Sequence, residues 1–427
     1  MQSPIKMFAL PLALIAAGGL NLSVSAQSYD TGEVFDTGGI ELTTGVELSV
    51  SSEDNRALET TSAGNSTEAQ ARLSFGLLRE TQVSRLALDL SGTLRAIDTP
   101  DDTSQNNGFD TPGVSLSYGR SSASARLGLS ASLRESELSQ DYLDADGLDY
   151  VTGTATRRLT NAEASLNWGE DSSLGFGTFA RIATTTYRDG TASGLDGAAL
   201  DDSTRRTLGA TSRMDLDAAR RLDLGLTWSD FEQDTIPDRR ETLSLNSTLT
   251  QELVRGALTL GLNATSTEEG ERYGATLGRS LEMPSGQVSG QIGLNSSVSG
   301  NTYLSGGLDL SRDLARGKLT FGLSRAVSSS DTDDTEVLRT QASMGLTQEL
   351  TPISGIRFGL NLSKSEETDN GAQSSNANFG VTYNRELPSD WTFATGYNHR
   401  IREDDAGDTA RSNRVFLQMQ RSFVTRF

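Results

Sequence analysis

Apolar residues recur at every second position through most of the chain, in short runs separated by polar, glycine-rich or acidic segments. Alternation with a period of two is typical of β-strands that have one apolar and one polar face. Clear runs are Ile40–Val50, Ala71–Leu77, Leu86–Leu94, Ala125–Leu133, Ala162–Trp168, Leu222–Trp228, Leu258–Leu262, Leu319–Leu323, Ile356–Leu362 and Val415–Phe427. We count about twenty such runs, each close to the roughly 10 residues that a tilted strand needs to cross a bilayer.

The connections between these runs alternate between short and long. The short ones are Arg79–Ser84, Gly119–Ser124, Gly169–Ser173, Asp217–Arg221, Gln251–Gly256, Glu282–Gln287, Arg312–Gly317, Gln348–Gly355 and Arg385–Asp390. Most of the others are longer and acidic, namely Glu135–Tyr150, Arg188–Arg205, Ser229–Glu241, Ser328–Glu336, Lys364–Ser375 and Arg402–Asn413. A meander that crosses a membrane has this pattern, because short turns collect on the periplasmic side and long loops on the other.

Two architectures use repeated hairpins of this kind: a soluble β-solenoid or propeller, and a transmembrane barrel. Soluble repeats have regular lengths, whereas the length of the hairpin unit varies here from about 30 to about 50 residues. Within hydrocarbon every backbone polar group must be paired, so a spanning sheet has to close on itself. We therefore predict an all-β fold in which residues 39–427 form an antiparallel transmembrane β-barrel of about 20 strands, with about 18 as the alternative, short periplasmic turns and long acidic external loops.

The N-terminal segment has the pattern of a secretory signal peptide. Lys6 supplies a short positive region, Met7–Ala17 an apolar stretch, and Val24–Ala26 the small residues that signal peptidase recognises. A membrane anchor is the alternative, but the apolar stretch is short and interrupted by Pro11. We predict a signal peptide at residues 1–26 and a periplasmic tether at residues 27–38.

Composition excludes several classes of function. The chain has no cysteine, so disulfide frameworks, thiolate zinc sites and cysteine nucleophiles are impossible. The net charge of -20 argues against nucleic-acid binding. His399 is the only histidine, and no hydrolase triad, cofactor fingerprint or metal cluster can be assembled around it. We expect His399 to be an interfacial residue, and we expect no enzyme activity, no cofactor and no bound metal.

The signal peptide, the alternating strands, the acidic loops and the terminal aromatic together resemble Gram-negative outer-membrane β-barrel proteins of porin-like type, without identifying one family. In that class a C-terminal aromatic preceded by alternating apolar residues resembles the signal read by the barrel-assembly machinery. Phe423 and Phe427 match it, whereas Arg421 and Thr425 depart from the apolar pattern. The resemblance implies location in the cell outer membrane. It implies outer-membrane lipid, lipopolysaccharide and the assembly machinery as partners.

If the apolar residues face lipid, the residues between them face the lumen. These are polar or charged, as expected from the cost of about 2 to 4 kcal/mol for a basic residue in the middle of the lipid face. The lumen-lining candidates are Glu47, Arg72, Asp89, Arg95, Glu163, Arg181, Arg213, Asp215, Asp309, Arg339 and Arg357. Charges of both signs inside a barrel either tune solute passage or form a stabilising network, and the residues leave both interpretations open.

These observations predict a porin-like channel for passive diffusion of ions or small polar solutes. A plugged structural or surface-display barrel and a conduit for polymer secretion are the alternatives. Because even 16 to 18 strands enclose an aqueous channel, something has to narrow a barrel of about twenty. Arg188–Arg205, which is rich in small residues, is the first candidate for an inward-folded loop, and Glu135–Tyr150 is the second.

Overall fold

The computed structural model describes residues 39–100, 108–137, 152–153, 155–188, 192–193, 201–234, 236–329, 336–368, 371–403 and 407–427. The predicted signal peptide and tether (1–38) therefore lie outside the described residues, as does most of Glu135–Tyr150. No helix within the described ranges is long and apolar enough to span a membrane.

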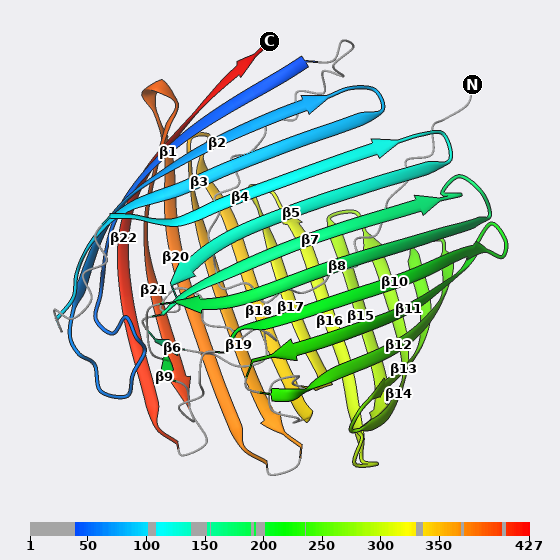
Figure 1. Cartoon of the computed structure of the whole chain (residues 1–427). Helices are drawn as coiled ribbons and strands as arrows, with labels where there is room; N and C mark the ends of the chain where they lie inside the picture. The colour runs from blue at the N-terminus through cyan, green and yellow to red at the C-terminus, as the bar shows by residue number, and fades with distance from the viewer. Residues whose placement is uncertain are drawn as a thin grey trace.

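The described chain is almost entirely β-structure (Figure 1). The strands are β1 (Gly39–Glu53), β2 (Ser66–Glu80), β3 (Ser84–Asp98), β4 (Gly108–Ser121), β5 (Ala125–Glu137), β6 (Thr152–Gly153), β7 (Thr156–Trp168), β8 (Leu174–Arg188), β9 (Ala192–Ser193), β10 (Ser203–Asp215), β11 (Arg220–Gln233), β12 (Ile236–Leu253), β13 (Gly256–Thr267), β14 (Gly270–Met283), β15 (Gly286–Ser296), β16 (Thr302–Leu314), β17 (Gly317–Ser329), β18 (Glu336–Thr351), β19 (Ser354–Glu367), β20 (Gln373–Leu387), β21 (Trp391–Glu403) and β22 (Thr409–Arg426). A short 3₁₀ turn, η1 (Pro388–Asp390), joins β20 to β21.

Twenty of these strands form one antiparallel sheet, and the sheet closes because β22 pairs with β1. The first and last strands lie side by side in Figure 1, drawn in blue and red. Beside that ladder the Phe427 amide donates to the Ile40 carbonyl at 2.9 Å and the Ile40 amide donates back at 3.1 Å. The predicted all-β, antiparallel barrel of about 20 strands is confirmed. The short strands β6 and β9 pair with each other in a separate two-stranded sheet.

Short turns join the strands at one end of the barrel, and most of the connections at the other end are longer; the two-residue connection between β13 and β14 is an exception. We call these ends the short-turn end and the loop end; Gly39 and Phe427 both lie at the short-turn end. Glycines with positive φ begin β13 and β15, where the chain reverses tightly. One predicted loop, Ser229–Glu241, is mostly strand, because β11 and β12 continue almost to the reversal at Asp234.

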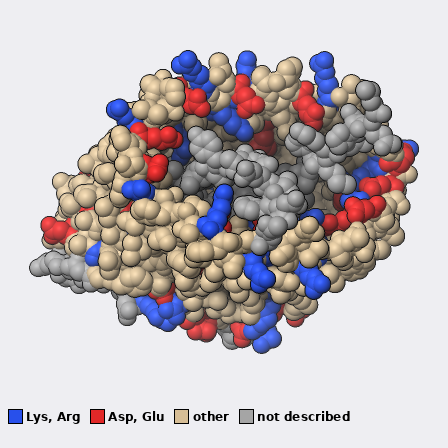
Figure 2. Space-filling model, turned by 90° about the horizontal axis from the view of Figure 1, so that it is seen from above, with Lys and Arg blue, Asp and Glu red and all other residues tan. Residues whose placement is uncertain are grey.

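The period of two places large apolar side chains on the outer surface. Leu48, Leu245 and Ile292 are 46%, 51% and 65% exposed, as residues of a lipid-facing wall are. Figure 2 shows a broad uncharged surface with charged residues gathered toward its margins. Serine, threonine, asparagine, glycine and charged residues occupy the alternate positions, so the polar face of the sheet is turned toward the barrel axis.

Candidate functional site: the barrel lumen

The strand registers place the sequence-predicted lumen residues on the face opposite the exposed leucines. They are Glu47, Arg72, Asp89, Arg95, Glu163, Arg181, Arg213, Asp215, Asp309, Arg339 and Arg357, which come from β1, β2, β3, β7, β8, β10, β16, β18 and β19. The registers bring some of them together and leave others apart. Their part in solute passage stays a prediction.

Two pairs of opposite charge lie across neighbouring strands in the middle of the wall. Glu163 and Arg181 are direct register partners, and the Arg181 Nε donates to the Glu163 Oε2 at 2.7 Å. Glu47 and Arg72 also face each other directly. Asp89 accepts a hydrogen bond from the Ser115 hydroxyl at 3.3 Å. The middle of the wall therefore presents fixed charges of both signs.

A group of largely buried charges lies at the loop end of β1, β2, β3 and β21. We call it the loop-end cluster, and its members are Glu53, Arg56, Glu68, Arg95 and Arg400. Arg400 donates to the Glu53 carboxylate. Arg56 Nη1 lies 2.9 Å from Glu68 Oε2, and Arg95 Nε lies 3.8 Å from Glu68 Oε1. Sequence reasoning selected only Arg95 of these five.

Ser412 completes the contacts of Glu53. The serine side chain is 1% exposed, and its hydroxyl donates to the Glu53 Oε1 at 2.6 Å. Because a buried charge without partners is strongly destabilising, a carboxylate in this position requires such donors. The cluster is thus a preformed arrangement of charges at one end of the lumen.

At the short-turn end the pairs are more exposed. Arg213 Nη2 lies 3.1 Å from Asp215 Oδ2 and also donates to the Glu170 carbonyl at 2.8 Å. Arg426 Nε lies 2.9 Å from Glu41 Oε2, next to the strand closure. Asp309, Arg339 and Arg357 lie on β16, β18 and β19, away from these pairs.

Sequence reasoning missed the aromatic residues on the inward face. Phe179, Phe231 and Phe416 occupy inward register positions, next to inward-facing Gly209, Arg205 and Gly396 respectively. The Arg205 guanidinium lies 5.0 Å from the centre of the Phe231 ring, which is a cation–π distance. The period of two was the available signal in the sequence, because each phenylalanine stands between two residues that occupy outward-facing positions.

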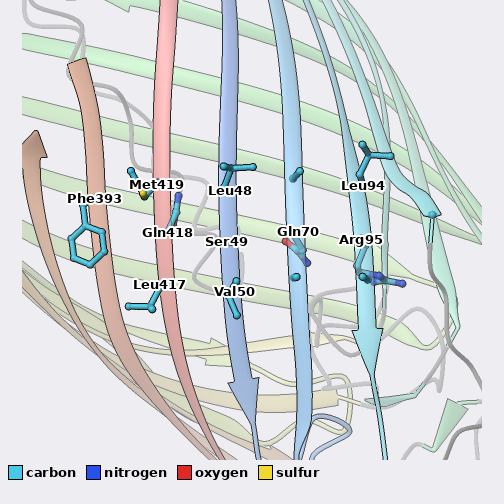
Figure 3. Close-up of a pocket in the computed structure, with 14 residues that line it drawn as sticks. Leu48, Ser49, Val50, Gln70, Leu94, Arg95, Phe393, Leu417, Gln418 and Met419 are labelled. Carbon is cyan, nitrogen blue, oxygen red and sulfur yellow. The ribbon is translucent and has the colours of Figure 1, made fainter. Parts of the chain in front are cut away.

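One groove, of about 650 Å³, is apolar and lies across β21, β22, β1, β2 and β3. Figure 3 shows Leu48 and Val50 of β1 together with Leu417 and Met419 of β22. These side chains belong to the outward register, and Leu48, Val50 and Leu417 are about half exposed. The groove is therefore part of the lipid-facing surface and is not a candidate for a solute path.

His399 also lies on the outward register, beside Tyr397. Its ring centre is 6.5 Å from that of Tyr397, and its Nδ1 lies 2.8 Å from the Asn413 Oδ1. Within the described ranges no three histidine, aspartate or glutamate residues lie close enough together to hold a metal ion.

The two candidate narrowing loops lie largely outside the described residues. Arg188 is the last residue of β8, and Ser203–Arg205 are the first of β10. Between them the structure describes Ala192–Ser193, as the strand β9 that pairs with β6, and the two residues directly before β10, Asp201 and Asp202. The inward folding of Arg188–Arg205 stays a prediction.

Comparison with solved structures gives a consistent fold. The siderophore receptor PirA from Pseudomonas aeruginosa matches with a TM-score of 0.52 and 13% identity, over 90% of this chain and 80% of that one. The siderophore receptor PirA from Acinetobacter baumannii matches with a TM-score of 0.50 and 10% identity, over 91% of this chain and 81% of that one. A variant of the ferric enterobactin receptor PfeA from Pseudomonas aeruginosa matches with a TM-score of 0.51 and 12% identity, over 89% of this chain and 80% of that one. No protein-family model and no curated protein matches the sequence.

These neighbours correct one prediction. The porin-like channel for passive diffusion is wrong, because the solved structures compared above are a siderophore receptor and a ferric enterobactin receptor, not passive porins. The physical reason is that strand alternation fixes the wall of a barrel but not how a solute passes through it, since one fold hosts several functions. The resemblance to Gram-negative outer-membrane barrels and the outer-membrane location are confirmed. The chain is a large, closed outer-membrane β-barrel protein.

Proposed function

We propose that this barrel carries out selective uptake of a small polar solute across the outer membrane, with its lumen wall as the path. One observation carries the proposal: the described strands turn most of their charged and hydrogen-bonding side chains inward and most of their large apolar side chains outward. Polar groups on a lumen wall set selectivity, whereas those on a lipid face only destabilise the barrel.

The loop-end cluster supports selection at one mouth of this path. Its charges are held by several partners at once, so their positions are fixed before a solute arrives. Preorganised charges between walls of low dielectric concentrate the field and favour solutes of complementary charge. In this proposal Glu53, Glu68 and the arginines around them select the solute, and the mid-wall pair Glu163–Arg181 lies further along the path.

The outer surface supports contact with lipopolysaccharide. Arg206 Nη1 lies 2.7 Å from Asp230 Oδ2 and 3.2 Å from Glu232 Oε2, on the outward register near the loop end. Arginine binds phosphate with good geometry, and carboxylates share divalent cations with it. As part of the proposal, Phe423 and Phe427 engage the assembly machinery, and the chain has no catalytic role.

Solute flux into proteoliposomes tests the proposal. Glucose, glucuronate and glucosamine are similar in size and differ in charge, so they separate selection by charge from selection by size. We expect the three fluxes to differ, and the preferred solute to show a rate that saturates with concentration. Arg400→Met should reduce the preference, because it removes one member of the loop-end cluster.

Protein that has been heat-denatured before reconstitution is the control for leakage of the lipid. Fluxes that are equal for the three solutes and rise in proportion to concentration would overturn the proposal, since they describe unselective diffusion.

A further inference from the structure

A second groove, of about 340 Å³, lies on the lumen wall across β17–β22. Its lining includes Lys318, Arg357, Asn361, Asn398 and Phe416, and all five occupy inward register positions. No aspartate or glutamate is among the described residues that line it. The groove is distinct from the loop-end cluster and from the apolar groove on the outer surface.

Glycines make the floor of this groove. Gly345, Gly359 and Gly380 are consecutive register partners on β18, β19 and β20, so three neighbouring strands present no side chain at the same level. A Cβ atom at Gly380 would meet only the Tyr397 carbonyl oxygen, at 3.9 Å. The space above Gly380 is therefore open to a ligand, and a larger side chain there would occupy it.

Two cations of the lining, Lys318 and Arg357, have no partner of opposite charge within the described part of the chain. Lys318 and Arg357 make no ion pair within 4.0 Å among the described residues, even though Asp313 is the register partner of Lys318. Arg181 and Arg213, elsewhere on the wall, each have a carboxylate partner. An arginine and a lysine that converge on one groove present donors for an anionic group, most favourably a carboxylate.

The rest of the lining fits a hydroxylated ring. The Oδ1 atom of Asn398 is shielded from solvent and accepts no hydrogen bond within the described part of the chain. The Phe416 ring lies over Gly396, because a Cβ at that glycine would come within 2.6 Å of it. Amide groups pair with hydroxyls, and an aromatic face packs against the apolar face of a ring.

We propose that this lumenal groove is a binding site for a sugar acid, a hydroxylated ring compound that carries one carboxylate. Lys318 and Arg357 bind the carboxylate, Asn361 and Asn398 bind hydroxyls, and Phe416 packs against the ring. This inference rests on the proposed function, in that it names the class of solute for the same lumen.

Isothermal titration of the detergent-folded barrel with glucuronate tests the site without requiring transport. Wild-type protein should bind glucuronate and should bind glucose at least tenfold more weakly, because glucose lacks the carboxylate. Benzoate, which has the carboxylate but no hydroxyls, should also bind more weakly than glucuronate.

Two variants locate the binding. The double variant Lys318→Gln, Arg357→Gln should weaken glucuronate binding tenfold or more. Arg221→Gln, at an inward position of β11, should leave it unchanged. Gly380→Leu should abolish binding by filling the groove. Gly225→Leu is its matched control, since Gly225 also faces inward and a Cβ there meets nothing within 4 Å.

Heat-modifiable migration on gels identifies the variants that remain folded. Equal affinities of wild-type protein for glucuronate and glucose, or the same loss with Gly380→Leu and Gly225→Leu, would overturn the site. Saturable uptake of another solute together with absent glucuronate binding would refute this inference and leave the proposed function standing. Unselective, linear flux together with glucuronate binding would refute the proposed function alone.

Discussion

A charged side chain on this wall stabilises the barrel to a degree that depends on how much water reaches it. The Glu53–Arg400 pair is nearly excluded from solvent, with side chains 11% and 9% exposed. The Glu163–Arg181 pair is 32% and 43% exposed. Removing one partner from a buried pair leaves an uncompensated charge, whereas water replaces the partner of an exposed one.

Arg400→Met should therefore lower the free energy of unfolding by about 3 to 5 kcal/mol. The matched variant Arg181→Met should lower it by no more than about 1 kcal/mol. Urea titrations of the barrel in detergent or lipid, followed by tryptophan fluorescence, measure both values. Equal losses for the two variants would contradict the structural difference between the pairs.

The inward face could be predicted residue by residue where charge marked it. Arg95 and Arg357 stand between apolar residues, and a basic residue that faces lipid is costly. The alternation of the strand therefore predicts that both arginines face the lumen. Phe416 carried no such mark, because phenylalanine is acceptable on either face. The burial of Glu53 could not be predicted, since Ser412 and Arg400 approach it from strands more than 340 positions away.

At the scale of the hairpin, glycine determines where the chain can reverse. Gly286 begins β15 with φ 145°, and a Cβ there would lie 2.0 Å from the Ser311 carbonyl oxygen. Gly119, near the end of β4, has open space around its Cβ position. The two glycines therefore differ in whether a side chain is tolerated.

Gly286→Ala should destabilise the barrel by about 1 to 3 kcal/mol, because the backbone there is strained for other residues and the ladder to β16 has to shift. Gly119→Ala should change stability by less than about 0.5 kcal/mol. The same urea titration gives both numbers. An unchanged free energy of unfolding in Gly286→Ala would contradict the close contact between Gly286 and β16.

Asp217, in the turn between β10 and β11, gives a pH-dependent prediction. Its carboxylate accepts a hydrogen bond from the Ala219 amide at 2.8 Å and pairs with Arg220, and these contacts lower the pKa of Asp217 below its usual 3.8. A lowered pKa adds stability that is present above the unfolded value and is lost as pH falls through the folded value. The difference in urea midpoint between wild type and Asp217→Ala should therefore shrink below pH 3.8 and be constant above pH 6. A difference in urea midpoint that grows as the pH falls would contradict a lowered pKa of Asp217.

The sequence predicted the short connections better than the long ones. Turns such as Gln251–Gly256 and Glu282–Gln287 contain a glycine at the start of the following strand, so their positions can be predicted from the sequence. The acidic composition of Ser229–Glu241 predicts a loop, and this prediction is wrong. In the structure its acidic residues Asp230 and Glu232 are strand positions paired with Arg206, and a cross-strand partner of this kind is not visible in one strand alone.

The whole barrel depends on one non-local contact, the pairing of β1 with β22. Its ladder extends to Glu41 and Arg426, with the mutual Ile40–Phe427 backbone bonds beyond it. Closure removes the free edges that a sheet cannot expose to lipid. Phe427 and Phe423 are 76% and 46% exposed on the outer surface, so neither supplies much packing within the folded chain.

Phe427→Ala and Phe423→Ala should therefore reduce the amount of assembled barrel in the outer membrane by severalfold while changing the stability of the assembled fraction little. Leu308→Ala, another exposed outward residue, is the control and should assemble normally. Heat-modifiable migration of membrane fractions measures assembly. Normal assembly of both phenylalanine variants would show that these residues are not part of the assembly signal.

Selective passage along the inward face of the wall is the central claim, and single cysteines test it most directly because the chain has none of its own. Ser363 faces inward on β19, and the adjacent Leu362 is 43% exposed on the outer surface. In proteoliposomes, Ser363→Cys should react with a bulky, charged, water-soluble maleimide, and the reaction should lower the flux of the preferred solute. Leu362→Cys should be protected by lipid and should leave flux unchanged. Equal labelling at the two positions, or undiminished flux after labelling of Ser363→Cys, would contradict the account.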